Sequence, residues 1–262
     1  MATRHEDGSA GDADYGVIGA GYARYRQPDS RIAAMILAAL GNARTVLNVG
    51  AGAGSYEPTD REVTAVEPSA SMRAQRPGHL PVAVDAVAGQ LPFPDGAFDA
   101  SMATFTVHQW PDLGAGLAEM RRVTRGPVVI MTCDPPLLDR FWLAAYEPEV
   151  IATEVRRYPA IEAIVDGLGG RSEVQPVPIP NACTDGFGEA YFGRPEAFLD
   201  PGVRLAMSAW SFVEPALVEA GLEQLRADLA SGRWDARHGH LRSQLEFEGA
   251  LCFVIGQPGA RV

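Results

Sequence analysis

The sequence predicts an α/β fold built on a doubly wound, mostly parallel sheet of seven strands. Short apolar runs alternate with helix-type patterns up to residue 134, and the first of these runs ends in a glycine cluster. The alternation then stops, and apolar runs return only near the end of the chain. These observations predict a helical and loop insertion after the fifth strand and an antiparallel C-terminal hairpin that completes the sheet.

Five apolar runs rich in β-branched residues predict the parallel strands. They cover residues 45–50, 62–68, 80–87, 97–106 and 126–134. Between them, amphipathic spacing predicts helices at 28–40, 69–77 and 112–124, the first with an Asp/Ser start signal and the second with a Ser cap. Parallel neighbours joined by helices imply right-handed crossovers.

Beyond residue 134 the pattern is mainly helical. Helix-like pieces are predicted at 138–146, 159–168, 195–210 and 215–232, with an extended segment and loop at 177–187 and the hairpin at 241–257. We therefore divide the chain into a disordered tail (1–14), an N-terminal lid segment and helix (15–41), a ligand-binding core (42–134), a substrate-binding helical insertion (135–234) and C-terminal strands (235–262).

Composition excludes several classes of function. A net charge of −11 argues against nucleic acid as a partner, since phosphates would be repelled. No apolar run is long enough to span a bilayer and no signal peptide is evident, so we expect a cytoplasmic protein without membrane partners. All 22 basic residues are Arg, which excludes lysine Schiff-base chemistry. The three cysteines are widely spaced, so neither disulfides nor a metal site is expected.

Two glycine clusters could form a nucleotide-type loop. The first, "VIGAG" at 17–21, has only two apolar residues before it and carries Arg24 where a third glycine would be needed. The second, "TVLNVGAGAGSYEP" at 45–58, follows a complete apolar strand and has the pattern GxGxG rather than GxGxxG. Because the last glycine serves a pyrophosphate in dinucleotide sites, its displacement favours a nucleoside cofactor without a phosphate cradle.

Glu67 is the acidic partner of the second glycine cluster. It ends the second predicted strand, 17 residues after Gly50. A carboxylate at this place can accept hydrogen bonds from both hydroxyls of an adenosine ribose.

Residues 46–134 resemble the class I S-adenosylmethionine-dependent methyltransferases, in particular the ubiquinone/menaquinone-biosynthesis-like branch of small-molecule enzymes. "LNVGAGAGSY" resembles the glycine motif of this family, and "VTAVEPSASM" its ribose-binding strand. "AVAGQLPFPDGAFDAS" and "VHQWPDLGAGLAEMRRVTRGPVVIMT" resemble the later strand and helix motifs. The chain departs from the pattern at Gly89 and Gln90, where an acidic residue is usual, and at Gln109, where a second His is frequent.

The resemblance implies a Rossmann-like sheet, S-adenosylmethionine as cofactor and a set of contacts with it. The backbone at Gly50, Ala51, Gly52 and Gly54 would meet the methionine part and the ribose. Further contacts are implied for Glu67 on the ribose, for Pro68, Met72, Val87 and Ala88 around the adenine, and for Thr104 near the transferred methyl group.

The segment "GYARYRQPDSR" at 21–31 is interpreted as part of a lid over the cofactor. Tyr22 and Tyr25 can cover apolar surface and favour a sulfonium by cation–π attraction. Arg26 can clamp the methionine carboxylate. An ordinary amphipathic helix start is the alternative interpretation.

His108, just after the fourth predicted strand, is the candidate general base, with a structural role as the alternative. Aromatic side chains of the insertion are candidates for an acceptor pocket, together with Tyr22 and His108. They are Trp142, Tyr146, Tyr158, Phe187, Tyr191, Phe192 and Trp210, with Asp185 and Arg194 as polar candidates.

These observations predict methyl transfer by in-line displacement to an oxygen or nitrogen, with carbon as a third option, of a small aromatic or heterocyclic metabolite. The enzyme would act as a monomer or homodimer. Two alternatives stay open: a non-catalytic protein that binds S-adenosylmethionine or S-adenosylhomocysteine, and an NAD(P)-dependent oxidoreductase. The latter lacks both GxGxxG and a Ser/Tyr/Lys catalytic set.

Overall fold

A computed structural model describes residues 5–13 and 22–259. Its centre is a six-stranded sheet with the order β2-β1-β3-β4-β8-β5. The strands are β1 (Thr45–Val49), β2 (Glu62–Val66), β3 (Ala100–Thr104), β4 (Val128–Cys133), β5 (Arg171–Pro176) and β8 (Leu251–Gln257). Strands β1 to β4 pair in parallel, and β8 is antiparallel to both neighbours. The mostly parallel α/β class is confirmed, with six strands rather than seven.

The missing strand is the one predicted at 80–87. Only an isolated parallel bridge joins Val84 to Val66 there. Pro81 has no N–H for a ladder, and Val82 is 92% exposed, so neither pairing nor burial supports a strand. Ala83 and Ala86 are buried, whereas Val82 and Val84 are exposed, so the stretch packs against the core without forming a strand.

The antiparallel pair at the C-terminal end of the sheet is present, but its first strand lies elsewhere than predicted. Strand β8 pairs with β5, which comes from the range expected to be insertion. The segment predicted as the other arm forms η6 (Gly239–Ser243) and β7 (Glu246–Phe247), and β7 pairs with β6 (Ile179–Pro180) in a separate small sheet. The core thus includes part of 135–234, and the range 235–262 contributes a single strand to it.

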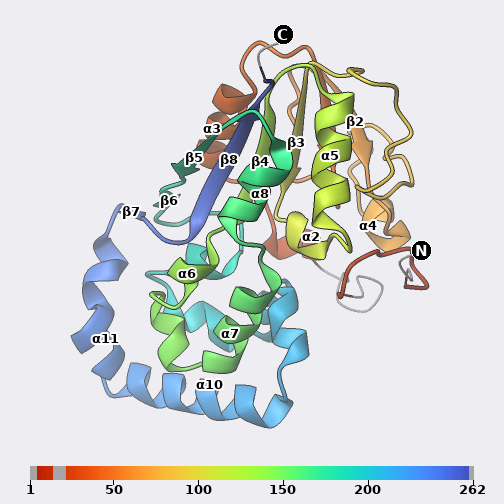
Figure 1. The fold of residues 1–262 in the computed structure, drawn as a ribbon. Coiled ribbons are helices and arrows are strands. Elements are labelled where there is room, and N and C mark those ends of the chain that lie inside the picture. Colours follow the sequence, from red (N-terminus) through yellow and green to blue (C-terminus); the bar gives the residue numbers. More distant parts are fainter. Residues whose placement is uncertain (1–4, 14–21, 260–262) are drawn as a thin grey trace.

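Helices cover both faces of the sheet, as alternating side chains in the strands require. Val129 and Met131 of β4 share one apolar cluster with Ile32 and Ile36 of α3 (Ser30–Leu40). Val128 and Ile130 face the other cluster, which contains residues of α5 (Leu113–Val123) and α8 (Ile161–Leu168). Figure 1 shows α5 and α8 on the same side of the sheet.

The predicted helix starts are confirmed. The Asp29 carboxylate accepts from the backbone N–H of Arg31, and Ser69 caps α4 (Ala70–Ala74) by accepting from Met72 N–H. At the start of α5, Asp112 accepts from Ala115 N–H at 2.8 Å. Each cap satisfies an amide that has no partner within its helix.

A second lobe, mostly helical, lies beyond the carboxyl ends of the parallel strands (Figure 1). Its elements are α6 (Pro135–Leu138), η2 (Trp142–Ala145), α7 (Pro148–Arg157), η3 (Gly188–Tyr191), η4 (Pro195–Leu199), α9 (Pro201–Leu205), η5 (Ser208–Phe212), α10 (Pro215–Ala230) and α11 (Arg233–His238). The helix predicted at 215–232 is confirmed as α10, whereas the one predicted at 195–210 is broken into three short turns.

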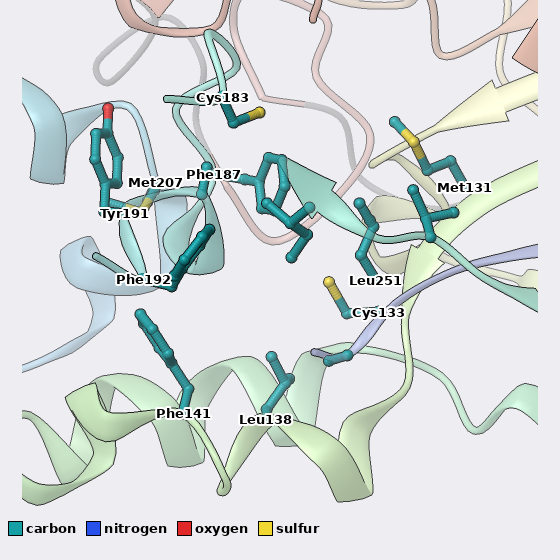
Figure 2. Packing of buried hydrophobic residues seen from close by; sticks show 14 of the residues in the cluster. Met131, Cys133, Leu138, Phe141, Cys183, Phe187, Tyr191, Phe192, Met207 and Leu251 are labelled. Carbon is teal, nitrogen blue, oxygen red and sulfur yellow. The ribbon is translucent and has the colours of Figure 1, made fainter. Parts of the chain in front are cut away.

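Figure 2 shows the junction between this lobe and the sheet. Cys133, at the end of β4, belongs to one buried cluster with Leu138, Phe141, Phe187 and Leu251. One continuous apolar core therefore runs from the sheet into the lobe and fixes the lobe over the strand ends.

The N-terminal segment was predicted to be disordered over 1–14, and residues 5–13 contradict this. Asp7 accepts hydrogen bonds from the hydroxyls of Ser69 (2.6 Å) and Ser71 (2.8 Å). Asp12 pairs with Arg157 of α7 at 2.7 Å. The acidic residues that suggested a solvated tail are instead the anchors of this segment. Residues 1–4 and 14–21, which include the "VIGAG" part of the predicted lid, lie outside the described residues.

No helix in the described part of the chain is both long and apolar enough to cross a membrane.

Candidate active site

A cavity of about 570 Å³ lies at the carboxyl ends of β1, β2 and β3, the usual ligand position in a doubly wound sheet. Its volume falls within the range of small-molecule sites. Residues from segments 9–11, 50–56, 67–72, 86–90 and 104–115 line it, together with Tyr22, Arg26 and Asp185.

The glycine loop after β1 forms the floor of this first cavity. Gly50 and Gly52 have φ angles of 69° and 52°, a region that favours glycine. The amides of Gly50 and Ala51 both donate to the Val66 carbonyl at 2.9 Å, which ties the loop to the end of β2. A Cβ atom on Gly50 would collide with the side chain of Thr106. The loop therefore brings bare backbone to the cavity.

Substituting Gly50 by alanine is expected to weaken cofactor binding at least tenfold. The added methyl group meets Thr106, and either the loop or the segment after β3 must move. Gly41→Ala is the matched control because Gly41 also has a positive φ (58°), but a Cβ there meets no atom within 4 Å. Calorimetry with S-adenosylhomocysteine should give a normal affinity for Gly41→Ala. Equal affinities for both variants would show that the glycine loop can shift to admit the methyl group without weakening cofactor binding.

Glu67, just after β2, lies beside the glycine loop and is 7% exposed. Its Oε2 accepts from Gly52 N–H and its Oε1 from Ser69 N–H, both at 2.8 Å. Burial raises the pKa of this carboxyl group, and the two amides act in the opposite direction. Since a carboxylate can accept about four hydrogen bonds, both oxygens keep capacity for the hydroxyls of a ribose. The Glu67 oxygens are thus acceptors that fit the ribose hydroxyls in the adenosine part of S-adenosylmethionine.

Most of the cofactor contacts implied by the sequence line the first cavity. They are Arg26, Gly50, Ala51, Gly52, Glu67, Pro68, Met72, Val87, Ala88 and Thr104. Pro68, Met72, Val87 and Ala88 supply the apolar surface that a purine ring needs.

Two residues with implied cofactor contacts, Gly54 and Tyr25, lie outside the lining of the first cavity. Gly54 does not line the cavity, and a Cβ there would point at Leu80 and Arg76 instead. Tyr25 turns away on the short helix α2 (Tyr22–Tyr25), and its hydroxyl donates to Asp200 at 3.3 Å. Of the two tyrosines, only Tyr22 lines the first cavity, because Tyr25 is directed to Asp200.

Arg26 is held by a partner that the sequence did not indicate. Its Nε donates to Asp185 Oδ1 at 2.6 Å, and Tyr56 Oη donates to Oδ2 of the same carboxylate at 3.0 Å. The guanidinium lies 4.8 Å from the ring centre of Phe105 and 5.4 Å from that of Tyr22. Although burial opposes it, Asp185 raises the pKa of Arg26 well above its usual value. Asp185 thus positions Arg26, while N–H groups outside this pair leave the guanidinium able to meet a carboxylate.

A second cavity, of about 70 Å³, lies between the sheet and the helical lobe. Tyr22, Arg26 and Phe105 line both cavities and separate them. The remaining wall is largely apolar and comes from β4, α6, α7 and the segment 187–210. Among the predicted acceptor residues, Tyr22, His108, Tyr158, Phe187 and Trp210 line this cavity.

Three predicted acceptor residues, Trp142, Tyr146 and Tyr191, lie in the core of the lobe. Trp142 Nε1 donates to the Phe192 carbonyl at 2.9 Å, and Tyr146 Oη donates to Asp228 at 2.9 Å. Tyr191 packs edge-on against Phe198. Each of the three side chains thus contacts another residue of the lobe, and none of them lines either cavity.

Arg194 is also structural, since its guanidinium donates to the carbonyls of Cys183 and Ala190, both at 2.9 Å.

His108 lies in the wall of the second cavity, with its ring 4.5 Å from that of Tyr158. Burial lowers its pKa to about 3, with Arg157 adding to the effect. A ring with this pKa is neutral at pH 7 but takes a proton poorly. The physical setting therefore favours His108 as a neutral hydrogen-bonding group over its predicted role as general base.

Sequence reasoning missed three contributors to the two cavities. Phe105, whose backbone φ is 51°, directly follows β3 and stands between the cavities. Glu154 of α7 projects into the second cavity. Ser9, Ala10 and Gly11 cover part of the first. Phe105 could have been predicted from the sequence, since it adjoins Thr104 at a strand end. The positions of Glu154 and of residues 9–11 depend on long-range packing.

Comparison with known proteins agrees with this site. A methyltransferase-domain family model matches residues 47–130, the part that carries the glycine loop and Glu67. A crystal structure from Anabaena variabilis, named as a methyltransferase from an antibiotic biosynthesis pathway, is 30% identical with a TM-score of 0.82. The alignment covers 88% of this chain and 98% of that one.

Two further proteins share less. A SAM-dependent methyltransferase from Thermotoga maritima is 16% identical with a TM-score of 0.52, over 93% of this chain and 91% of its own. An uncharacterized Escherichia coli protein, YafE, is 33% identical over 79 residues, which are 29% of this chain and 38% of that protein.

The fold and the site define a class I enzyme that uses S-adenosylmethionine. The chain belongs to the S-adenosylmethionine-dependent methyltransferases, and S-adenosylmethionine is its cofactor.

Proposed function

We propose that this enzyme transfers a methyl group to an oxygen or nitrogen of a small aromatic or heterocyclic acceptor whose reacting end occupies the second cavity. The observation that carries the proposal is the wall that the two cavities share. Tyr22, Arg26 and Phe105 face the cofactor site on one side and the second cavity on the other. A nucleophile in the second cavity therefore approaches the cofactor through these three side chains.

The aromatic part of the lining of the second cavity favours an acceptor with an aromatic or heterocyclic ring. Phe141, Phe187, Tyr158 and Trp210 contribute aromatic surface, and Phe105 packs 5.1 Å from the Phe187 ring. At about 70 Å³ the cavity is smaller than the roughly 150 Å³ that holds a benzene ring. The cavity as it stands admits one end of an acceptor, and a ring must widen it or extend towards the first cavity.

The bound cofactor supplies an electrophilic methyl group on a sulfonium, so the protein needs mainly to orient the acceptor and exclude water. Correct alignment can provide about 7–11 kcal/mol of the barrier reduction. The lobe core around Phe141 and Phe187 holds the second cavity rigidly against the sheet. Phe105 and Arg26 close the boundary from the sheet side.

Several narrower assignments stay predictions: the ubiquinone/menaquinone-like branch, the cytoplasmic location, and the monomeric or homodimeric state. The pathway of the Anabaena relative supports a specialised small metabolite as the acceptor.

A panel assay tests the proposal. Small phenols and heterocyclic amines are incubated with the enzyme and labelled S-adenosylmethionine, and the best acceptor is then used with two variants. Ala206→Leu adds three carbons to the wall of the second cavity, whereas its neighbour Leu205 is 58% exposed and lines neither cavity. Ala206→Leu should raise the acceptor KM at least tenfold without changing cofactor affinity, and Leu205→Ala should change neither. A normal KM for Ala206→Leu would place the acceptor elsewhere, and a panel without any labelled product would reject the proposed acceptor class.

A further inference from the structure

The second cavity contains a half-buried carboxyl group that has no hydrogen-bonding or ion-pairing partner among the described residues. Glu154 lies on α7 and lines the cavity. Among residues 5–13 and 22–259, no hydrogen bond or ion pair engages its side-chain oxygens, although Arg157 and Arg26 act on it at longer range. Burial raises the pKa of Glu154 to about 7. Such a group is costly to keep ionised unless something neutralises it.

The other charged groups around Glu154 are already engaged. Arg26 pairs with Asp185 and Arg157 pairs with Asp12. Glu189, which also lines the cavity, accepts from the backbone N–H of Ala250, just before β8. When Glu154 ionises, the cavity therefore carries a net negative charge that the described protein groups leave uncompensated.

A second acceptor atom in the same wall also lacks a partner. Nδ1 of His108 is buried, and no described residue hydrogen-bonds to it. With the Gln109 amide placed so that its nitrogen donates to Asp12 (3.1 Å), its oxygen faces Nε2 of His108 at 3.0 Å. This network assigns the proton to Nε2 and leaves Nδ1 as an acceptor. The low pKa of His108 keeps the ring neutral.

The Glu154 carboxylate and Nδ1 of His108 thus both accept hydrogen bonds, and the surface around them is largely aromatic. A protonated amine is a cation that only donates, and it is attracted to the faces of aromatic rings. A hydroxyl would satisfy only one of the two acceptors, and an anion would be repelled by Glu154.

We propose that the acceptor carries a basic nitrogen, which the second cavity binds as an ammonium between Glu154 and Nδ1 of His108. The proposal rests on the proposed function and narrows its acceptor to an amine. His108 was already a sequence candidate for the acceptor pocket, whereas Glu154 was not, since α7 and the turn after β3 meet only in the fold.

The same carboxylate then prepares the nitrogen for methylation. One N–H bond of the ammonium breaks, its proton forms an O–H bond on Glu154, and the lone pair returns to the nitrogen. The lone pair forms the new N–C bond as the C–S bond breaks, and the electron pair of that bond stays on sulfur. No group is oxidised or reduced. A carboxyl group with a pKa near neutrality suits this exchange.

The test measures binding, so it does not depend on turnover. The protein is saturated with S-adenosylhomocysteine, and two matched pairs are titrated by NMR and calorimetry: n-propylamine against 1-propanol, and benzylamine against benzyl alcohol. Wild type should bind one amine at least tenfold more tightly than its alcohol. The preference should rise with pH up to about 7, as Glu154 ionises.

Glu154→Gln keeps the shape of the side chain and should abolish the preference. Glu147→Gln is the control, since Glu147 is a buried acid just before the same helix and lines neither cavity. If Glu154→Gln shows altered S-adenosylhomocysteine affinity or unfolding, Glu154→Asp takes its place and should retain a reduced preference.

The outcomes separate the two proposals. An alcohol bound as tightly as its amine, or a preference that survives Glu154→Gln, overturns the ammonium site. If labelled methyl groups then appear on a phenol and Ala206→Leu still impairs the transfer, the proposed function holds without the amine. If no member of either pair binds and the panel assay yields no product, both proposals fail.

Discussion

Asp185→Ala is expected to destabilise the protein by about 3–5 kcal/mol, the cost of leaving a buried charge without its partner. Asp185 is 1% exposed and holds Arg26 at 2.6 Å, and its second oxygen accepts from the Tyr56 hydroxyl. Removing the carboxylate takes away the acceptor of both the Arg26 guanidinium and the Tyr56 hydroxyl. Denaturant unfolding followed by circular dichroism measures the loss.

Asp95→Ala is the matched control for this prediction. Asp95 pairs with Arg122 at 2.8 Å but is 82% exposed, and surface pairs contribute about 0–1 kcal/mol. In a double-mutant cycle, adding Arg26→Met to Asp185→Ala should restore part of the lost free energy of unfolding, because the buried guanidinium is then absent. If Asp185→Ala and Asp95→Ala cost the same, the pair is not the anchor of this boundary.

Glu67→Ala should weaken the binding of S-adenosylhomocysteine by about 1–3 kcal/mol, the usual cost of losing hydrogen bonds to a charged group. The carboxylate bridges Gly52 of the glycine loop and Ser69 at the start of α4, so its removal also loosens the loop. Calorimetry gives the affinity directly. Glu62→Ala, at the exposed start of β2, should bind the ligand as wild type does. An unchanged affinity for Glu67→Ala would mean that the ribose lies elsewhere.

The parts of the fold that were predictable are those whose signal is local. Strands β1 and β4 are mainly apolar runs rich in β-branched residues, and caps such as Asp29 and Ser69 stand beside the helices that they start. Strand β5 has no such signal, because "RSEVQP" is polar and lies at an exposed sheet edge. It becomes a strand only because β8 offers it a partner. The run "LPVAV" is the opposite case. It has the apolar pattern of a strand, but it pairs with β2 only through the isolated bridge between Val84 and Val66.

The two cavities differ in predictability for the same reason. The glycine loop and Glu67 form a contiguous motif whose geometry is set within two strands. The second cavity is assembled from segments far apart in the chain, and an aromatic residue carries no sign of which way it will point. Phe187 faces the cavity, whereas Tyr191, four residues later, packs into the lobe. Arg26 was predictable as a lid cation, but its pairing with Asp185 spans 159 residues.

The orientation of the cofactor is the point on which the whole account rests, and a crystal structure with S-adenosylhomocysteine measures it directly. The account predicts that the ribose hydroxyls lie within hydrogen-bond distance of the Glu67 carboxylate. It also predicts that the sulfur faces the boundary formed by Tyr22, Arg26 and Phe105. A nucleoside bound away from Glu67, or a sulfur directed away from that boundary, would contradict it.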